Sequence, residues 1–417
     1  MDCLFTLKFK RMKKLLPLLF ILSLGTQVIQ AQNHNNQKLL LISFDGFRSD
    51  YLTKTDTPNF DALVKQGVIS KGLIPIFPTK TFPNHYSIAT GLYPENHNLI
   101  SNSMVDKQLG LRYSIRDRGQ VENPIWYGGE PIWNTVEKSG KKAGTMFWVG
   151  SEAPIQNMRP TFWKRYDGDM GGQARIDSVI AWMSLGNEKE IDFGTLYFSK
   201  TDDMGHKFGP DSPEVEQAIQ NADTLIGYLI RQLKEKDLLS NTNIIIVSDH
   251  GMSKISRDKI IVLDNYIDIG NVDIIENSPS LMMNIISGEV YAIYELLKNA
   301  NKPMQVYTRE DLPERFRLKK SQRVPDLVVI PDIGYTIDIK SVFDNQPNYP
   351  SGGTHGFDNI TKEMQAILIL SGPSFKQGIE MPEVENIHLY ELMVHLLGIE
   401  SAGTDGSIKP FMHVIKE

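Results

Sequence analysis

The chain has 417 residues, of which 41% are hydrophobic and 23% are charged, a composition typical of a globular protein with a substantial core. Its formal net charge is −6, and an acidic surface offers no general footprint for nucleic acid, which requires clustered basic charge. The only cysteine is Cys3, so disulfides, thiolate zinc sites and thiol catalysis are excluded for the rest of the chain.

The amino terminus has the pattern of a targeting segment. A basic pair precedes the apolar run 15–22, and small or polar residues follow as far as Ala31. This order predicts a secretory signal peptide over residues 1–31, with Met12 as a possible true start. The apolar run is shorter than the ~20 residues that span a bilayer. We therefore expect a periplasmic or secreted protein without a membrane span. Because residues 1–31 carry a net charge of +4, the remainder would carry −10.

The first predicted strand covers residues 38–44, a continuous apolar run of the kind that is buried on both faces of a parallel sheet. Asp45 and Gly46 follow it directly. Open α/β sheets bind their ligands at the carboxyl ends of the strands, so Asp45 is a candidate functional carboxylate. Taken alone, Asp45 would fit an Asx-turn or a helix cap better.

Residues 78–84, Pro-Thr-Lys-Thr-Phe-Pro-Asn, place a hydroxyl just before a predicted helix that runs to Gly91. We interpret Thr81 as a nucleophile. A threonine hydroxyl is scarcely ionised at neutral pH and needs an activating group. The chain has no Gly-x-Ser-x-Gly motif, but aspartate and histidine recur at strand ends, which makes metal ions the candidate activators.

Further elements alternate along the chain. Helices are predicted at 58–66, 131–136, 175–185, 213–236 and 387–397, and strands at 68–75, 142–148, 193–198, 243–248 and 366–370. This alternation predicts an α/β fold with a doubly wound, mostly parallel sheet flanked by helices, extending over residues 38–417. The pattern weakens around 253–350, where we expect a small inserted subdomain. Within it, the basic stretch 315–323 is interpreted as a solvated face.

Aspartate and histidine follow two more predicted strands. Asp202 and His206 stand four residues apart after 193–198, Asp249 and His250 follow 243–248 directly, and His355 lies in a glycine-flanked loop. Each of these alone would fit a surface ion pair or a cap, but the pattern recurs three times. With Asp45 they give six ligands, enough for two zinc ions that keep open positions for substrate. The remaining histidines are interpreted as structural or exposed: His34, His85, His97, His388, His395 and His413.

Together these motifs resemble the nucleotide pyrophosphatase/phosphodiesterase family of the alkaline phosphatase superfamily, in its bacterial single-domain form. The resemblance covers the chain from about Lys38 to its end. It rests on Phe44-Asp45-Gly46 and residues 78–86, 90–95, 129–133, 202–206, 248–252 and 355–356. It implies an alkaline-phosphatase-like fold and a zinc-dependent phosphodiesterase that forms a threonine-bound intermediate. Nucleoside triphosphates would yield a monophosphate and pyrophosphate.

The resemblance also implies a role for each residue. One zinc, which activates Thr81, would be held by Asp45, Asp249 and His250. The second zinc, near the leaving group, would be held by Asp202, His206 and His355. Asn102 would bind a phosphate oxygen, and the aromatic rings of Phe82, Tyr166 and Tyr197 would stack on a nucleobase. No motif around Thr81 supplies an arginine for a monoester dianion, so diesters are the expected substrates.

Two alternatives stay open from the sequence. The first is a phosphonoacetate-hydrolase-like or monoesterase activity in the same superfamily. The second is an exported metal-binding protein without catalysis, although the presence of all six ligands and of Thr81 argues against it. The expected partner is a nucleotide or another small phosphodiester, and the sequence points to no protein partner.

Overall fold

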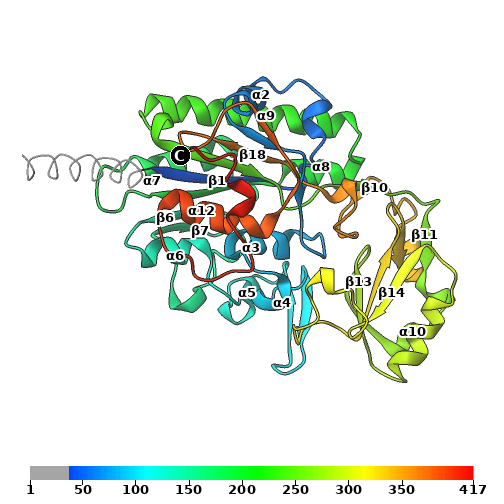
Figure 1. Cartoon of the computed structure of the whole chain (residues 1–417). Helices are drawn as coiled ribbons and strands as arrows, with labels where there is room; N and C mark the ends of the chain where they lie inside the picture. Colours follow the sequence, from blue (N-terminus) through cyan, green and yellow to red (C-terminus); the bar gives the residue numbers. More distant parts are fainter. Residues whose placement is uncertain (1–36, 417) are drawn as a thin grey trace, which may run out of the picture.

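The computed structural model describes residues 37–416, and the predicted signal peptide lies outside them. A central sheet of eight strands has the order β19-β2-β18-β9-β1-β8-β6-β7 (Figure 1). Neighbouring strands are parallel except at β18, which runs antiparallel to both β2 and β9. In sheet order the strands are Ile379–Met381, Val68–Ser70, Leu368–Ser371, Thr242–Val247, Lys38–Phe44, Phe193–Phe198, Ala143–Met146 and Phe162–Lys164. The predicted α/β fold with a mostly parallel sheet is confirmed.

Two helical layers cover the sheet because the side chains of its central strands alternate between its faces. Along β1, Leu39 and Leu41 enter one hydrophobic cluster, whereas Leu40 and Ile42 enter the other. The first cluster packs against α3 (Thr81–Thr90), α6 (Ile132–Lys138) and α12 (Leu389–Leu397). The second packs against α2 (Pro58–Lys65), α7 (Gly172–Met183) and α9 (Pro213–Glu235), and Figure 1 shows α2 and α9 on the face opposite α3 and α12.

A second lobe contains a four-stranded antiparallel sheet, β12-β13-β15-β14, with its own hydrophobic cluster (Figure 1). Its elements are β12 (Val272–Glu276), β13 (Leu281–Ile285), α10 (Val290–Lys298), β14 (Met304–Thr308) and β15 (Leu327–Pro331), with β11 (Ile260–Val262) paired to β16 (Thr336–Asp338). This lobe lies within the stretch where the sequence predicts an insertion. It contacts the main body through β12 and the hairpin of β4 (Ser103–Asp106) and β5 (Leu111–Ser114).

Shorter elements connect these layers. They are β3 (Leu73–Ile74), α4 (Pro94–His97), α5 (Arg118–Val121), α8 (Lys200–Phe208), β10 (Ser253–Lys254), α11 (Lys340–Asn345), β17 (Gly353–Thr354) and β20 (Val384–Glu385). The strand predicted at 142–148 stops at Met146, because Phe147 adopts a left-handed conformation with φ of 65°. Within residues 37–416, no helix combines the length and the apolar character needed to cross a bilayer.

The basic stretch 315–323 is not uniformly solvated, so that interpretation is wrong at its last residue. Arg323 is 8% exposed. Its guanidinium donates to Asp106 Oδ2 at 3.0 Å and to the backbone carbonyls of Asn98, Ile125 and Trp126. A planar group with five N–H donors can satisfy several buried acceptors at once, which a hydrophobicity pattern does not reveal.

Both ends of the described chain meet at one residue. Gln37 Oε1 accepts a hydrogen bond from Ser374 Oγ at 2.6 Å, and the backbone N–H of Lys416 donates to the Ser374 carbonyl at 2.8 Å. Ser374 follows β18, whose antiparallel direction brings its last residue beside the start of β9. The ends therefore lie at the edge of the sheet where the parallel strands β1 and β9 begin.

Candidate active site

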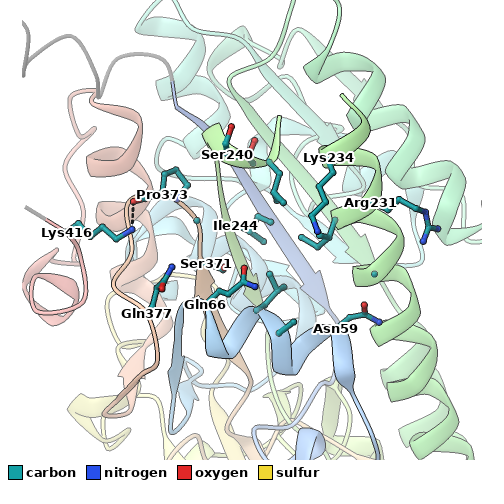
Figure 2. A pocket seen from close by; sticks show the side chains of 17 residues that line it. Asn59, Gln66, Arg231, Lys234, Ser240, Ile244, Ser371, Pro373, Gln377 and Lys416 are labelled. Carbon is teal, nitrogen blue, oxygen red and sulfur yellow. Dashed lines mark hydrogen bonds between the residues drawn. The ribbon is translucent and has the colours of Figure 1, made fainter. Parts of the chain in front are cut away.

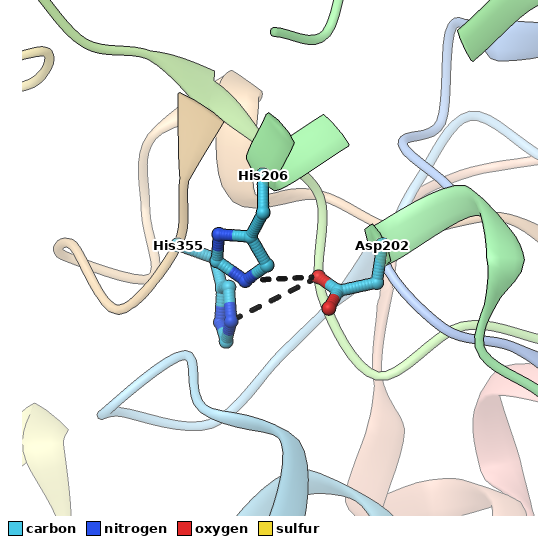
Figure 3. A group of neighbouring side chains, drawn as sticks. All are labelled: Asp202, His206 and His355. Carbon is cyan, nitrogen blue, oxygen red and sulfur yellow. Dashed lines mark ion pairs between the residues drawn. The ribbon is translucent and has the colours of Figure 1, made fainter. Parts of the chain in front are cut away.

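The six predicted ligands converge at the opposite edge, where the parallel strands end. His250 Nε2 lies 3.0 Å from Asp249 Oδ2 and 3.5 Å from Asp45 Oδ1. Asp202 Oδ1 lies 3.4 Å from His206 Nε2 and 3.9 Å from His355 Nε2, and Figure 3 shows this carboxylate facing both imidazoles. The rings of His250 and His355 stack with centroids 3.5 Å apart, so the two groups of ligands are adjacent.

The three histidines share one hydrogen-bonding pattern. In His206, His250 and His355 the Nδ1 atom lies 2.8 to 3.0 Å from a backbone carbonyl, of Gly353, Gly251 and Thr79 respectively. A carbonyl can only accept, so each Nδ1 carries a proton, and in the neutral form of each ring Nε2 presents a lone pair. Metal-binding histidines are commonly fixed in this way by a hydrogen bond from the second ring nitrogen. Burial also lowers the pKa of His355 well below 6.5, which keeps that imidazole neutral.

The three aspartate carboxylates also suit a cation-binding site. One oxygen of each aspartate, Asp45 Oδ1, Asp202 Oδ1 and Asp249 Oδ2, is buried without a hydrogen-bond partner among the described residues. An unpaired buried carboxylate oxygen is costly. Burial raises the pKa of Asp45 well above its ordinary value, and the neighbouring Asp249 and Asp202 raise it further. Nitrogen and oxygen ligands without thiolate match a zinc site, and divalent cations would remove this electrostatic penalty.

Thr81 is the first residue of α3, and its Oγ1 lies 3.3 Å from His250 Nε2. The free N–H groups and the dipole at a helix amino terminus favour negative charge, so this position suits both an ionised hydroxyl and a phosphate. The next backbone N–H, of Phe82, donates to Asn102 Oδ1 at 3.0 Å. The structure thus brings Thr81, Phe82 and Asn102 together beside the ligands.

A cavity of about 280 Å³ extends from Thr81 and Asp45 to the three predicted aromatic residues, Phe82, Tyr166 and Tyr197. The two tyrosine rings meet edge to face with centroids 6.1 Å apart. Tyr197 has a further role that the sequence did not show, because its hydroxyl donates to Asp45 Oδ2 at 2.6 Å. Tyr166 is 41% exposed at the cavity rim.

Sequence reasoning missed two contributors to this region. His85 is buried, as expected of a structural histidine, but its Nδ1 lies 2.9 Å from the Thr81 carbonyl and 3.4 Å from Asp249 Oδ2. Its position four residues after Thr81, on the same helix face, was the available signal. Arg118 also lines the cavity of Thr81, where it pairs with Glu152 and Glu122. Because Arg118 is distant from Thr81 in sequence, no local motif pointed to it.

Another cavity, of about 560 Å³, lies between α2, α9 and the start of β9 (Figure 2). Its polar lining includes Arg231, Lys234 and Lys416, but none of the predicted ligands and no candidate nucleophile. The predicted nucleophile, Thr81, and the predicted ligands Asp45 and Asp202 instead line the smaller cavity at the other edge of the sheet.

A mostly parallel α/β sheet with aspartates and histidines clustered around a helix-terminal threonine offers the ligand types and the candidate nucleophile of a metal-dependent hydrolase. The chain belongs to the Type I phosphodiesterase / nucleotide pyrophosphatase family, whose model matches residues 39–358. The resemblance seen in the sequence is thereby confirmed.

The comparisons also identify individual relatives. Venom phosphodiesterase CdcPDE of Crotalus durissus collilineatus is 38% identical over 390 residues, which are 91% of this chain and 46% of the venom enzyme. The chain thus spans about half the length of that relative. Human ectonucleotide pyrophosphatase/phosphodiesterase family member 5 is 35% identical over 89% of this chain and 77% of its own. The solved structure of murine member 5 aligns with a TM-score of 0.87 at 34% identity, covering 91% of this chain and all of that one.

Proposed function

We propose that this protein is an exported two-zinc phosphodiesterase and nucleotide pyrophosphatase with Thr81 as its nucleophile. The observation that carries the proposal is the place of the Thr81 hydroxyl, 3.3 Å from His250 Nε2 within the group of six ligands. Family membership supports the activity. The names of the relatives, venom and ectonucleotide enzymes, agree with export.

In the proposed site, Asp45, Asp249 and His250 hold one ion next to Thr81. The second ion is held by Asp202, His206 and His355. Bound zinc would supply positive charge that stabilises an ionised hydroxyl and the phosphate oxygens. The Nδ1 hydrogen bonds of the three histidines keep their Nε2 atoms free for this coordination.

The chemistry proceeds in two displacements at phosphorus. In the first, the Thr81 hydroxyl gives up its proton to solvent and its oxygen forms a bond to phosphorus while the bond to the leaving group breaks, and the first product departs. Water then cleaves the threonine–phosphate bond and releases the second product, which restores the hydroxyl. The amino terminus of α3 stabilises negative charge throughout. Asn102 is oriented by the Phe82 N–H, which fixes its Oδ1 and leaves Nδ2 as the donor for a phosphate oxygen.

The cavity supports diesters and nucleotides as the substrate class. Phe82, Tyr166 and Tyr197 offer aromatic surface to a base, and stacking tolerates every base. Arg118 lies in the same cavity, but its charge is already paired with Glu152 and Glu122, so the expectation of diester preference stands. Murine family member 5 was solved as an inactive variant, in which alanine replaces a threonine, in complex with AMP.

The proposal is tested with Thr81→Ala and Thr81→Ser, assayed on bis(p-nitrophenyl) phosphate, its monoester and ATP. The alanine variant should lose turnover while it stays folded and keeps its metal, and the serine variant should keep part of the activity because the hydroxyl remains. The wild type should prefer the diester and convert ATP to AMP and pyrophosphate. An active alanine variant would remove Thr81 from the mechanism, and release of ADP and phosphate would contradict the substrate class.

A further inference from the structure

The inserted lobe places a buried carboxylate against the loop that carries Asn102. Glu276 is the last residue of β12 and is 8% exposed. Its Oε2 accepts hydrogen bonds from Ser101 Oγ at 2.7 Å and from the backbone N–H of Ser103 at 2.8 Å. These two donors lie on either side of Asn102, so one oxygen of the second lobe holds both ends of this short segment.

Asn102 itself is fixed from the main body. Its Oδ1 accepts from the Phe82 N–H at 3.0 Å, and its backbone carbonyl accepts from the Ile115 N–H at 3.1 Å. The side-chain amide therefore has its oxygen engaged and its Nδ2 left for substrate. The position of Nδ2 depends on the backbone of residues 101–103, and that backbone is tied to Glu276.

The second oxygen of Glu276 faces the nucleophile segment. Glu276 Oε1 lies 3.8 Å from Lys80 Nζ, and Lys80 directly precedes Thr81. Lys80 also approaches the Ser278 carbonyl at 3.5 Å. A single carboxylate thus lies between the two chain segments that would contact the phosphate.

The backbone of β12 is adapted to this contact. The pairing of β12 with β13 shifts in register between Ile274 and Glu276, the pattern of a β-bulge. Bulges redirect side chains and are frequent next to active sites. The consecutive residues Ile275 and Glu276 at this irregularity are both buried.

We propose that Glu276 is a positioning residue for phosphodiester cleavage, acting through the 101–103 segment to hold Asn102 Nδ2 against a phosphate oxygen. This inference rests on the proposed function of the Thr81 site. It gives the inserted lobe an indirect part in catalysis, because small displacements of a phosphate-binding group cost activity steeply.

The test is a double-mutant cycle on the full chain with bis(p-nitrophenyl) phosphate, using Glu276→Ala, Asn102→Ala and the double variant. Glu276→Ala should lower kcat by about 10- to 100-fold with little change in KM. In the Asn102→Ala background the same substitution should have almost no further effect, because the group that it positions is gone. Metal content and circular dichroism should match the wild type.

Three further variants sharpen the test. Glu276→Gln keeps an acceptor for the loop and should restore most of the lost activity. Ser101→Ala removes one loop contact without creating a cavity in β12, and it should lower kcat about fivefold. This variant still tests the proposal if Glu276→Ala does not fold. The matched control is Asp273→Ala, which breaks the exposed ion pair of the same strand with Arg112 at the same contact between lobes and should change kcat less than about twofold.

The possible outcomes are distinct. Independent, additive losses in the double variant, or equal losses in the glutamine and alanine variants, would overturn the positioning role. If Asn102→Ala kept full activity while Glu276→Ala lost most of it, the positioning role of Glu276 would also be wrong. The proposed role of Thr81 as the nucleophile would not be affected by that result. If the folded, zinc-loaded wild type had no diesterase activity, the proposed function would be wrong, and this inference would be wrong with it.

Discussion

Tyr197 contributes two groups to the candidate active site, an aromatic ring and a hydroxyl. The ring lines the cavity beside Tyr166, and the hydroxyl donates to Asp45. Burial raises the pKa of Tyr197 well above 10, and the charge of Asp45 raises it further, so the hydroxyl stays a donor at neutral pH. In the proposed site, this one side chain would therefore orient a metal ligand and also offer an aromatic surface to the substrate.

These two roles can be separated by substitution. Tyr197→Phe keeps the ring and should lower kcat/KM by about tenfold for ATP and for bis(p-nitrophenyl) phosphate alike, because only the hydrogen bond to Asp45 is lost. Tyr197→Ala removes both groups and should lower ATP turnover far more than that of the small diester. The measurement is the ratio of the two kcat/KM values, and an unchanged ratio in the alanine variant would exclude base stacking by this residue.

At the scale of elements, α3 and α4 are joined by a histidine whose protonation state is defined by its neighbours. His97, the last residue of α4, accepts at Nδ1 from the Leu99 N–H at 3.1 Å. Its Nε2 lies 2.9 Å from Ser87 Oγ on α3 and therefore carries the proton. Burial lowers the pKa of His97 to about 3. The neutral imidazole of His97 is therefore part of the contact between α3 and α4.

This histidine makes stability depend on pH. Between pH 6.5 and about 3 the unfolded chain binds a proton at this residue and the folded chain does not, so stability is present above pH 6.5 and falls as the pH drops. The slope should be about 1.4 kcal/mol per pH unit from this residue. Denaturant unfolding between pH 7 and 4 should show a shallower slope for His97→Gln than for the wild type. Equal slopes would mean that His97 is protonated in the fold.

The sequence predicted the elements that carry the ligands because their signals are local. Buried strands such as 38–44 are continuous apolar runs, and parallel strands bring the residues that follow them to one edge. Asp45 and Asp249 could therefore be grouped without coordinates. The contacts of Glu276, Arg118 and Arg323 join residues that are far apart in the chain. The hydrophobic pattern of a sequence predicts helices and strands, but it does not predict which distant group a polar side chain contacts.

At the scale of the whole molecule, the six predicted ligands come from the ends of β1 and β9, from α8 and from the loop after β17, so metal binding should connect parts of the fold that are distant in sequence. Ligands that bind only the folded state stabilise it by mass action. Without bound ions, one buried oxygen each of Asp45, Asp202 and Asp249 has no hydrogen-bond partner among the described residues.

We expect purified protein to contain about two zinc ions per chain, since the six predicted ligand residues form two adjacent groups of the kind found in catalytic zinc sites. Chelation should abolish turnover and lower the midpoint of thermal unfolding, and zinc should restore both. Elemental analysis and thermal unfolding measure this directly. An active protein with one zinc or none would contradict the two-metal proposal.

The meeting of both chain ends at Ser374 has a practical consequence for engineering. A surface support or fusion partner attached at either end of residues 37–416 would be located at the edge where β1 and β9 begin, and Thr81 lies at the edge where they end. The immobilised protein would therefore present its candidate active-site cavity to the passing solution. The same closeness allows the ends to be joined by a short linker, so that the chain can be reopened in an exposed turn of the inserted lobe as a circular permutant.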